Sequence, residues 1–205
     1  MQLSFDMLSR RWPHAGHSLA EGIAASAAKV FDAFGLKDAA EQADFMAQVS
    51  AETGGGASVE ENLNYSATRL HQVWPSRFPT VASAVPYAYS PRALADRVYG
   101  NRGGNAPGTD DGYKFRGRGG IQITFKDNYV FVGKVAGIDL FNHPEIAVSP
   151  EHFLEVACAY WKLHDLNKWA DSANFREETL VINGGYNGLS DRERWRDIWR
   201  SELCA

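Results

Sequence analysis

Two glutamates flank three consecutive glycines in AETGGGASVEENLNY, the segment at residues 51–65. Two carboxyl groups on either side of a glycosidic bond are the equipment that most glycoside hydrolases use. In an unbroken helix the nine-residue interval would separate Glu52 and Glu61 by roughly 13.5 Å along the axis, on opposite faces. We therefore expect the glycines at 54–56 to end the helix, so that Glu61 turns back toward Glu52 across a gap that a sugar can occupy.

The two carboxyl groups are predicted to have different surroundings. Phe45, Val49 and Glu52 share the apolar face of a helix expected over residues 37–53. Burial and the negative end of the helix dipole both favour the protonated form of a carboxyl group there. Glu61 lies in a polar stretch and should stay ionised, so Glu52 fits a general acid and Glu61 a general base. An ordinary helix-end carboxylate and a solvated surface charge would explain this pair equally well.

A second segment, YKFRGRGGIQITFKDNY at residues 113–129, favours the chemical interpretation. It is a glycine-rich loop that runs into a predicted short strand. With a period of two, Ile121 and Ile123 point to one face while Gln122 and Thr124 point to the other. Such a strand would bury the isoleucines and present two polar groups to water and sugar hydroxyls in a cleft, although the edge of a surface hairpin would show the same pattern.

Four motifs in one order resemble glycoside hydrolase family 19, in its phage and bacterial endolysin branch. They are AETGGG, then ENLNYS, then GRGGIQIT with KDNY, then VINGG with a following arginine, and they extend from about residue 44 to residue 192. The plant chitinases of the family carry several disulfides that this chain lacks, and the interval between their two glutamates is longer. The resemblance therefore implies an enzyme that acts on bacterial walls.

The resemblance also implies roles for particular residues. Glu52 matches the general acid, Glu61 the general base, and Thr124 a residue that holds the attacking water. The family inverts the anomeric carbon and forms no covalent intermediate. Positions that bind substrate or support the base are matched by Gln122, Asn128, Asn183 and Arg192.

Two neighbours of the predicted base need separate mention. Glu60 stands directly beside Glu61, so the match could shift by one residue; we assign the base to Glu61 because it opens the ENLNYS motif. Tyr65 follows Glu61 by four residues in the same motif, and we expect it to contact substrate or to support Glu61.

These observations leave several functions open. The leading one is an endolysin that hydrolyses the β-1,4 bonds of peptidoglycan strands. A chitinase is the near alternative, and a lytic transglycosylase is another, since a glutamate ahead of a G-x-x-Q-I segment also fits that chemistry. A non-enzymatic reading takes the RGRGG run at residues 116–120 as a nucleic-acid-binding element, but the run occurs once, in an acidic chain.

Composition favours a compact enzyme without a cofactor. The 205 residues are 44% hydrophobic and 22% charged, with a net charge of −4. An acidic chain lacks the basic footprint of nucleic-acid binding and should not be strongly attracted to an anionic wall. Cys158 fits a buried thiol, a disulfide with Cys204 stays open, and neither the cysteines nor the histidines have spacings typical of a metal site.

The fold class expected is mainly α, of the lysozyme-like α+β type. Helical lobes would surround a substrate cleft, with a small β-hairpin element. We predict one catalytic domain over residues 1–205, with a small helical lobe inserted at about 66–110, no separate wall-binding domain, and a monomer. The sequence shows no signal segment and no run of apolar residues that could span a membrane. The protein would then accumulate in the cytoplasm and reach the wall after a membrane partner opens the way; the resemblance implies a holin.

Overall fold

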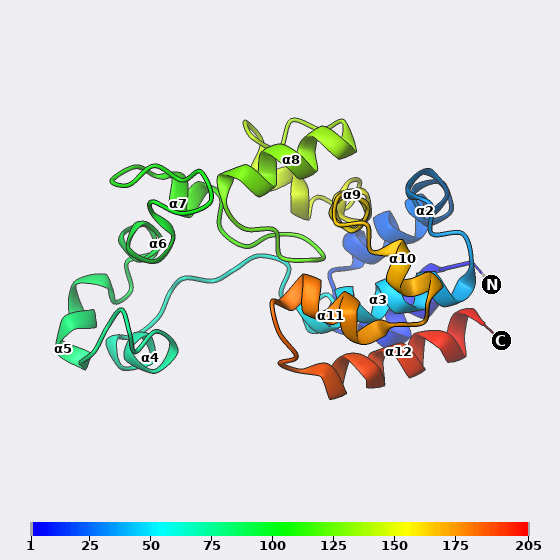
Figure 1. Cartoon of the computed structure of the whole chain (residues 1–205), viewed down its shortest axis with the longest axis horizontal. Coiled ribbons are helices and arrows are strands. Elements are labelled where there is room, and N and C mark those ends of the chain that lie inside the picture. Colours follow the sequence, from blue (N-terminus) through cyan, green and yellow to red (C-terminus); the bar gives the residue numbers. More distant parts are fainter. Residues whose placement is uncertain (1, 205) are drawn as a thin grey trace.

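The computed structural model describes residues 2–204, and helices supply nearly all of their regular structure. This confirms the predicted mainly helical class. Two groups of helices lie at opposite ends of the molecule (Figure 1). The larger group contains α1 (Phe5–Arg11), α2 (His17–Phe34), α3 (Ala39–Thr53), α9 (Phe153–Leu163), α10 (Asn167–Asp171), α11 (Phe175–Asn183) and α12 (Leu189–Leu203).

The smaller group is a lobe at the other end of the molecule (Figure 1). It contains α4 (Ala67–Val73), α5 (Val81–Ala84), η1 (Val85–Tyr87) and α6 (Pro91–Tyr99). The chain then returns to the larger group through α7 (Asp111–Lys114), α8 (Lys126–Ala136) and η2 (Pro144–Val148). Within residues 2–204 no helix is both long and apolar enough to cross a membrane.

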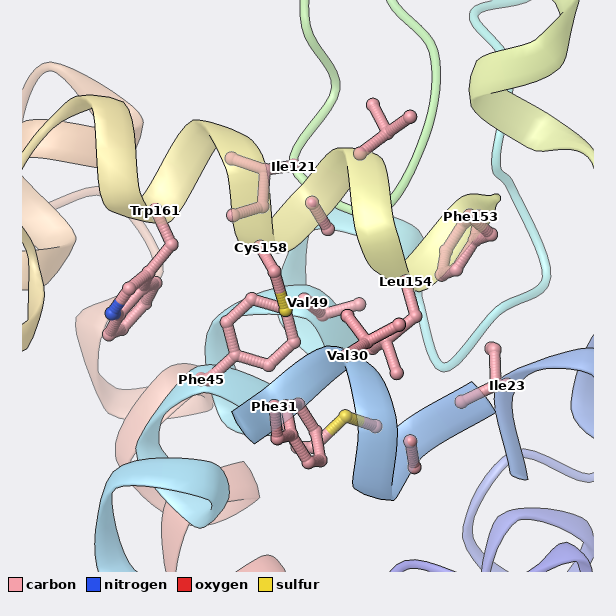
Figure 2. Packing of buried hydrophobic residues seen from close by; sticks show 14 of the residues in the cluster. Ile23, Val30, Phe31, Phe45, Val49, Ile121, Phe153, Leu154, Cys158 and Trp161 are labelled. Carbon is pink, nitrogen blue, oxygen red and sulfur yellow. The ribbon is translucent and has the colours of Figure 1, made fainter. Parts of the chain in front are cut away.

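Helix α3 is the centre of the larger group, and it carries Glu52 in its last turn. Asp38 caps its start, accepting hydrogen bonds from the backbone N–H groups of Ala40 and Glu41, and the Glu41 side chain bonds back in a capping box. Phe45 packs edge-on against Trp161 of α9, with ring centroids 5.3 Å apart. Figure 2 shows side chains of α2, α3 and α9 meeting in this core.

A buried serine joins three helices directly behind the Glu52 turn. The indole N–H groups of Trp12, which directly follows α1, and of Trp199 in α12 both donate to Ser50 Oγ, at 2.9 and 2.7 Å. Because both indoles are fully buried, these bonds replace the ones that water would make and fix the three helices relative to one another. Glu52 thus stands on a rigid support.

The three glycines end α3 as the sequence predicts. Gly54, Gly55 and Gly56 have φ of 58°, 67° and 76°, a left-handed conformation that costs a residue with a side chain energy. At Gly56 a Cβ atom would also lie 2.8 Å from atoms of Ala15 and Trp12. The chain then leaves the larger group and runs to the small lobe (Figure 1).

The small lobe has an apolar cluster of its own, separate from the main core. The cluster consists of Leu63, Leu70, Phe78, Ala84, Leu94, Ala95 and Val98. Most of these positions fall inside the lobe that the sequence predicts at about 66–110. The main core reaches from α1 to α12 and includes Cys158; both Cys158, which is buried, and Cys204, which is exposed, are free thiols.

The short strand predicted at residues 121–124 is wrong, and the small β-hairpin element is reduced to a turn closed by one bridge. Among the described residues the only β pairing here consists of isolated antiparallel bridges, from Arg118 to Glu60 and from Arg118 to Ile123. Gln122 has φ of 48°, so the chain turns where a strand would continue. Ile121 and Ile123 are nevertheless 5% and 2% exposed, because a tight turn can bury alternate residues as a strand does.

Helix α11 contains a buried carboxyl group that the sequence analysis did not single out. Glu178 is 0% exposed, and neither of its carboxyl oxygens has a hydrogen-bond partner among the described residues. Burial, and then the negative charge of nearby Asp44, raise the pKa of Glu178 to about 8, although Gln48, Arg196 and Arg200 act in the opposite direction. Glu178 is therefore protonated at neutral pH.

We expect Glu178→Gln to stabilise the protein near neutral pH, by roughly 3 kcal/mol at about pH 7. The pKa of Glu178 is about 8 in the folded protein, above the ordinary value of 4.5 that it has in the unfolded chain. As the pH rises above about 4.5, the unfolded chain loses this proton before the folded protein does. The free energy of unfolding of the parent therefore falls by about 1.4 kcal/mol per pH unit, up to about pH 8. Urea unfolding of both proteins across this pH range measures the difference in their free energies of unfolding. A difference that does not change with pH would contradict a raised pKa of Glu178.

Candidate active site

Glu52 forms an ion pair with Arg192, which α12 brings to the end of α3. Arg192 Nη2 donates to Glu52 Oε1, and the two side chains are 6% and 16% exposed. The guanidinium is buried, so its charge needs this carboxylate as a partner. The apolar helix face gave no indication of this partner, because Arg192 is remote in sequence from Glu52. The acid role of Glu52 stays a prediction.

A buried amide holds Arg192 in place. Gln48 lies one helical turn before Glu52 in α3 and is 0% exposed. Its Oε1 accepts from Arg192 Nη1 at 2.7 Å, and its Nε2 donates to Thr179 Oγ1 at 3.0 Å. The chain of bonds from Thr179 through Gln48 and Arg192 to Glu52 joins α11, α3 and α12, so the Glu52 carboxyl group has a fixed orientation.

Gln48→Met should lower kcat by about 10- to 100-fold with a smaller change in KM, because methionine fills the same space but cannot hold Arg192. The measurement is a kcat and KM determination together with the pH dependence of kcat. A change in that pH profile is expected, since a displaced Arg192 alters the charge beside Glu52. If Gln48→Met lowers stability but leaves the pH profile of kcat unchanged, the Gln48 amide has only a structural role.

Tyr160 of α9 lies within electrostatic reach of Glu52. Burial, and then the Glu52 charge, raise the pKa of Tyr160 to about 12. The phenol therefore keeps its proton across the pH range in which proteins work. It supplies a neutral hydrogen-bond donor on the same side as the predicted acid, and no sequence signal pointed to it.

Glu61 is held by two donors on the other side. Tyr99 Oη donates to Glu61 Oε1 at 2.6 Å, and the backbone N–H of Gly117 donates to Oε2 at 3.2 Å. Burial and the Glu61 charge raise the pKa of Tyr99 well above its usual value, so the phenol remains a donor. The two donors fix the position of the Glu61 carboxyl group, which a general base needs in order to reach a water molecule.

The Gly117 backbone brings Glu61 together with two further predicted site residues. A Cβ atom on Gly117 would lie 2.9 Å from Gln122 Oε1, 3.4 Å from Thr124 Oγ1 and 3.4 Å from Glu61 Cβ. The Glu61 N–H also donates to the Gly117 carbonyl at 2.8 Å. Three residues predicted from two separate motifs thus surround one glycine, where a larger residue would push them apart.

The polar side chains at this turn are joined by successive hydrogen bonds to the backbone. Gln122 Nε2 donates to the Gly119 carbonyl at 3.2 Å. Thr124 Oγ1 donates to the Gln122 carbonyl at 3.0 Å, and Asn128 Nδ2 donates to the Thr124 carbonyl at 2.8 Å. Asn128 therefore supports the turn that carries Thr124, while the lone pairs of Thr124 Oγ1 remain able to accept from a water molecule.

Glu60 occupies a different position from Glu61. Its Oε1 accepts from Arg116 Nη2 and from Arg118 Nε, both at 2.5 Å. Arg118 is buried, so its guanidinium needs this partner. The pairing makes Glu60 a tie between the 58–63 segment and the glycine-rich loop, and it favours Glu61 as the base, which stays a prediction.

A hollow of about 300 Å³ opens beside Glu61. It is bounded by Glu60, Glu61, Asn62, Leu63, Pro91, Tyr113 and Arg116. Tyr113 presents an aromatic ring with Arg116 against it, the guanidinium carbon 4.0 Å from the ring centroid. The mixture of carboxylate, guanidinium and aromatic groups suits a polar ligand with apolar faces, such as a sugar.

Two predicted residues take positions that the sequence did not anticipate. Tyr65 packs edge-on against Trp74, with centroids 5.7 Å apart, in the small lobe, and Tyr99 rather than Tyr65 donates to Glu61. Asn183 Nδ2 donates to the carbonyls of Gly185 and Asn187, at 3.3 and 3.2 Å. It shapes the turn before α12 and so helps to place Arg192.

Several known proteins are similar to this chain. The family model described as chitinase class I, of glycoside hydrolase family 19, matches residues 17–174, a span that contains Glu52, Glu61 and Thr124. A family 19 domain-containing protein of Haemophilus influenzae is 37% identical over 94% of this chain and 92% of its own length. An endochitinase of Solanum tuberosum is 31% identical over 88% of this chain, which spans 58% of that longer protein.

Solved structures share the fold at lower identity. Chitinase C of Streptomyces griseus superposes with a TM-score of 0.63 at 19% identity, covering 99% of this chain and 93% of the other. A mutant of a chitinase C gives a TM-score of 0.67 at 18% identity, again with 99% and 93% covered. The extent of the family match and the full-length bacterial relative lead to one conclusion: the chain belongs to glycoside hydrolase family 19 and is a glycosidase.

Proposed function

We propose that the protein hydrolyses β-1,4 glycosidic bonds of bacterial peptidoglycan by direct attack of water, with inversion at the anomeric carbon. The observation that carries the proposal is that the two carboxyl groups have different surroundings, which suit different roles. Glu61 is fixed by Tyr99 and Gly117 beside Thr124 and Gln122, whereas Glu52 stands on α3 against Arg192. Family 19 membership supports the glycosidase chemistry.

In the proposed reaction Glu61 removes a proton from a water molecule that also donates to Thr124 Oγ1. The water oxygen bonds to the anomeric carbon while the bond to the leaving oxygen breaks. Glu52 gives its proton to that oxygen, so one proton leaves the water and one reaches the leaving group. Return of a proton from Glu61 to Glu52 through solvent restores the enzyme.

This sequence requires Glu52 to take up a proton before the bond breaks. In the empty site Glu52 is paired with Arg192, and Arg192 is in turn hydrogen-bonded to Gln48. A sugar bound over Glu52 would exclude water and raise the cost of the carboxylate charge. We propose that substrate binding, rather than the empty site, brings Glu52 to its acid form.

Peptidoglycan is proposed over chitin for two reasons. The relative matched along nearly its whole length is bacterial, whereas the plant endochitinase is matched over little more than half of its own length. Both cysteines are free, unlike the disulfide-bearing plant enzymes that the sequence analysis set apart. Chitin hydrolysis is the second candidate, because the similar plant proteins are endochitinases.

Product analysis tests bond, chemistry and substrate together. Purified peptidoglycan treated with the enzyme should give muropeptides with ordinary reducing ends, and proton NMR read before mutarotation should show the α-anomer first from a β-linked substrate. Inversion is expected because a water must fit between the carboxyl groups, which in inverting enzymes stand about 6.5–9.5 Å apart.

Other products would overturn parts of this proposal. An initial β-anomer would mean retention and would remove the water-holding role of Thr124. A 1,6-anhydro end would mean transglycosylation. Release of soluble sugars from chitin but not from peptidoglycan would make chitin the substrate.

A further inference from the structure

The charge of the molecule is unevenly divided. Residues 62–102, which form the small lobe and the chain that leaves it, contain five arginines, no lysine and one acidic residue, Asp96, for a net charge of +4. Because the whole chain carries −4, the remaining residues together carry −8. The lobe lies at one end of the molecule (Figure 1), so the protein has a cationic end and an anionic body.

Most of the lobe's guanidinium groups are not neutralised by carboxylates. Within residues 2–204, Arg92 alone of the five takes part in an ion pair, with Asp110. Arg69, Arg97 and Arg102 are exposed. In the body, the arginines that form ion pairs include Arg10, Arg11, Arg192, Arg194 and Arg200, whereas Arg176 and Arg196 lie over aromatic rings. The lobe therefore presents free positive charge to solvent.

The cationic lobe is continuous with the hollow beside Glu61. Arg92 lies over the Tyr113 ring, its guanidinium carbon 4.6 Å from the centroid, and Arg116 lies 4.0 Å from the same centroid. Tyr113 and Arg116 line the hollow. A polymer that leaves the hollow on this side therefore passes Arg92 and reaches the surface of the lobe.

We propose that the small lobe is a docking surface for the carboxylate-bearing peptides of peptidoglycan, which it holds while a glycan strand lies beside Glu61. The inference rests on the proposed function, since it concerns the same substrate. Arginine binds carboxylates through paired N–H groups. Chitin carries no carboxylate and gains nothing from this surface, so the lobe would favour charged peptidoglycan.

The test compares Arg69→Gln/Arg97→Gln with the parent. Arg69 and Arg97 are exposed and lie outside the candidate active site. The control, Lys29→Gln/Lys134→Gln, removes the same charge from two exposed cations of the body. Binding to purified peptidoglycan and its hydrolysis are measured at low and high salt, with unmodified sacculi and with sacculi whose carboxyl groups have been amidated.

We expect the lobe variant to bind unmodified peptidoglycan about three- to tenfold more weakly at low salt, with the deficit vanishing at high salt or after amidation. The control should match the parent, and a soluble neutral chitin derivative should be hydrolysed equally by all three. Equal binding by the lobe variant and the parent would overturn the inference, as would an equal loss in the control.

The design separates this inference from the proposed function. If the parent does not hydrolyse peptidoglycan under any salt condition, the proposed function fails. If the parent hydrolyses it and the lobe variant binds it equally well, only the docking surface fails. A loss of binding that is confined to anionic lipid vesicles and absent on sacculi would assign the lobe to a membrane and overturn the inference.

Discussion

Glu52→Gln is expected to reduce hydrolysis of the wall by about 10²–10⁴-fold, the contribution typical of a general acid or base. Glutamine keeps the shape of the side chain and can still accept from Arg192, but it has no proton to give to a leaving oxygen. Because Arg192 is buried, loss of its anionic partner should also lower stability. The rate must therefore be measured on protein shown to be folded by circular dichroism and urea unfolding.

The matched control is Glu21→Gln, an exposed glutamate on α2 outside the site. It should leave the rate unchanged. Retention of near-parental activity by folded Glu52→Gln would remove Glu52 from the reaction.

Glu61→Gln and Glu60→Gln should differ in kind as well as in degree. Glu61→Gln removes the base and is expected to lower the rate by about 10²–10⁴-fold with little change in stability. Glu60→Gln deprives Arg116 and the buried Arg118 of their anion. It should lower the free energy of unfolding, by about 1–3 kcal/mol, and affect the rate less.

Both variants are measured on one wall preparation, with rate and urea unfolding determined side by side. Loss of rate in folded Glu60→Gln, together with an active Glu61→Gln, would move the base by one residue. In that case the bonds from Tyr99 and Gly117 to Glu61 would serve the fold rather than the reaction.

The sequence alone determined the features that depend on local chemistry. The helix that ends at Thr53 and the turn after it follow from three glycines with positive φ. The order of the four motifs predicted the family, and the alternation of Ile121 and Ile123 predicted their burial. The turn and the burial need only neighbouring residues, so propensity and periodicity are sufficient to predict them. The family was indicated by the resemblance of motifs spread along the chain.

The same local reasoning failed where a turn imitates a strand. Residues 121–124 alternate in burial, but positive φ at Gln122 and bonds to Gly119 and Arg118 make a turn. Alternation of apolar and polar residues indicates which side chains are buried, but it does not by itself show that the backbone is extended. One of the two bridges, from Arg118 to Glu60, joins this turn to a segment 58 positions earlier in the chain, and local patterns cannot predict it.

The partners of the two glutamates were decided by tertiary structure. Tyr99 reaches Glu61 across 38 positions, and Arg192 reaches Glu52 across 140. The resemblance placed Arg192 in the site but not against Glu52, and neither Tyr99 nor Gln48 belongs to a recognised motif. A hydrogen bond requires two groups within about 3 Å, and only the packing of α12 on α3 and of α6 near the glycine-rich loop sets those distances.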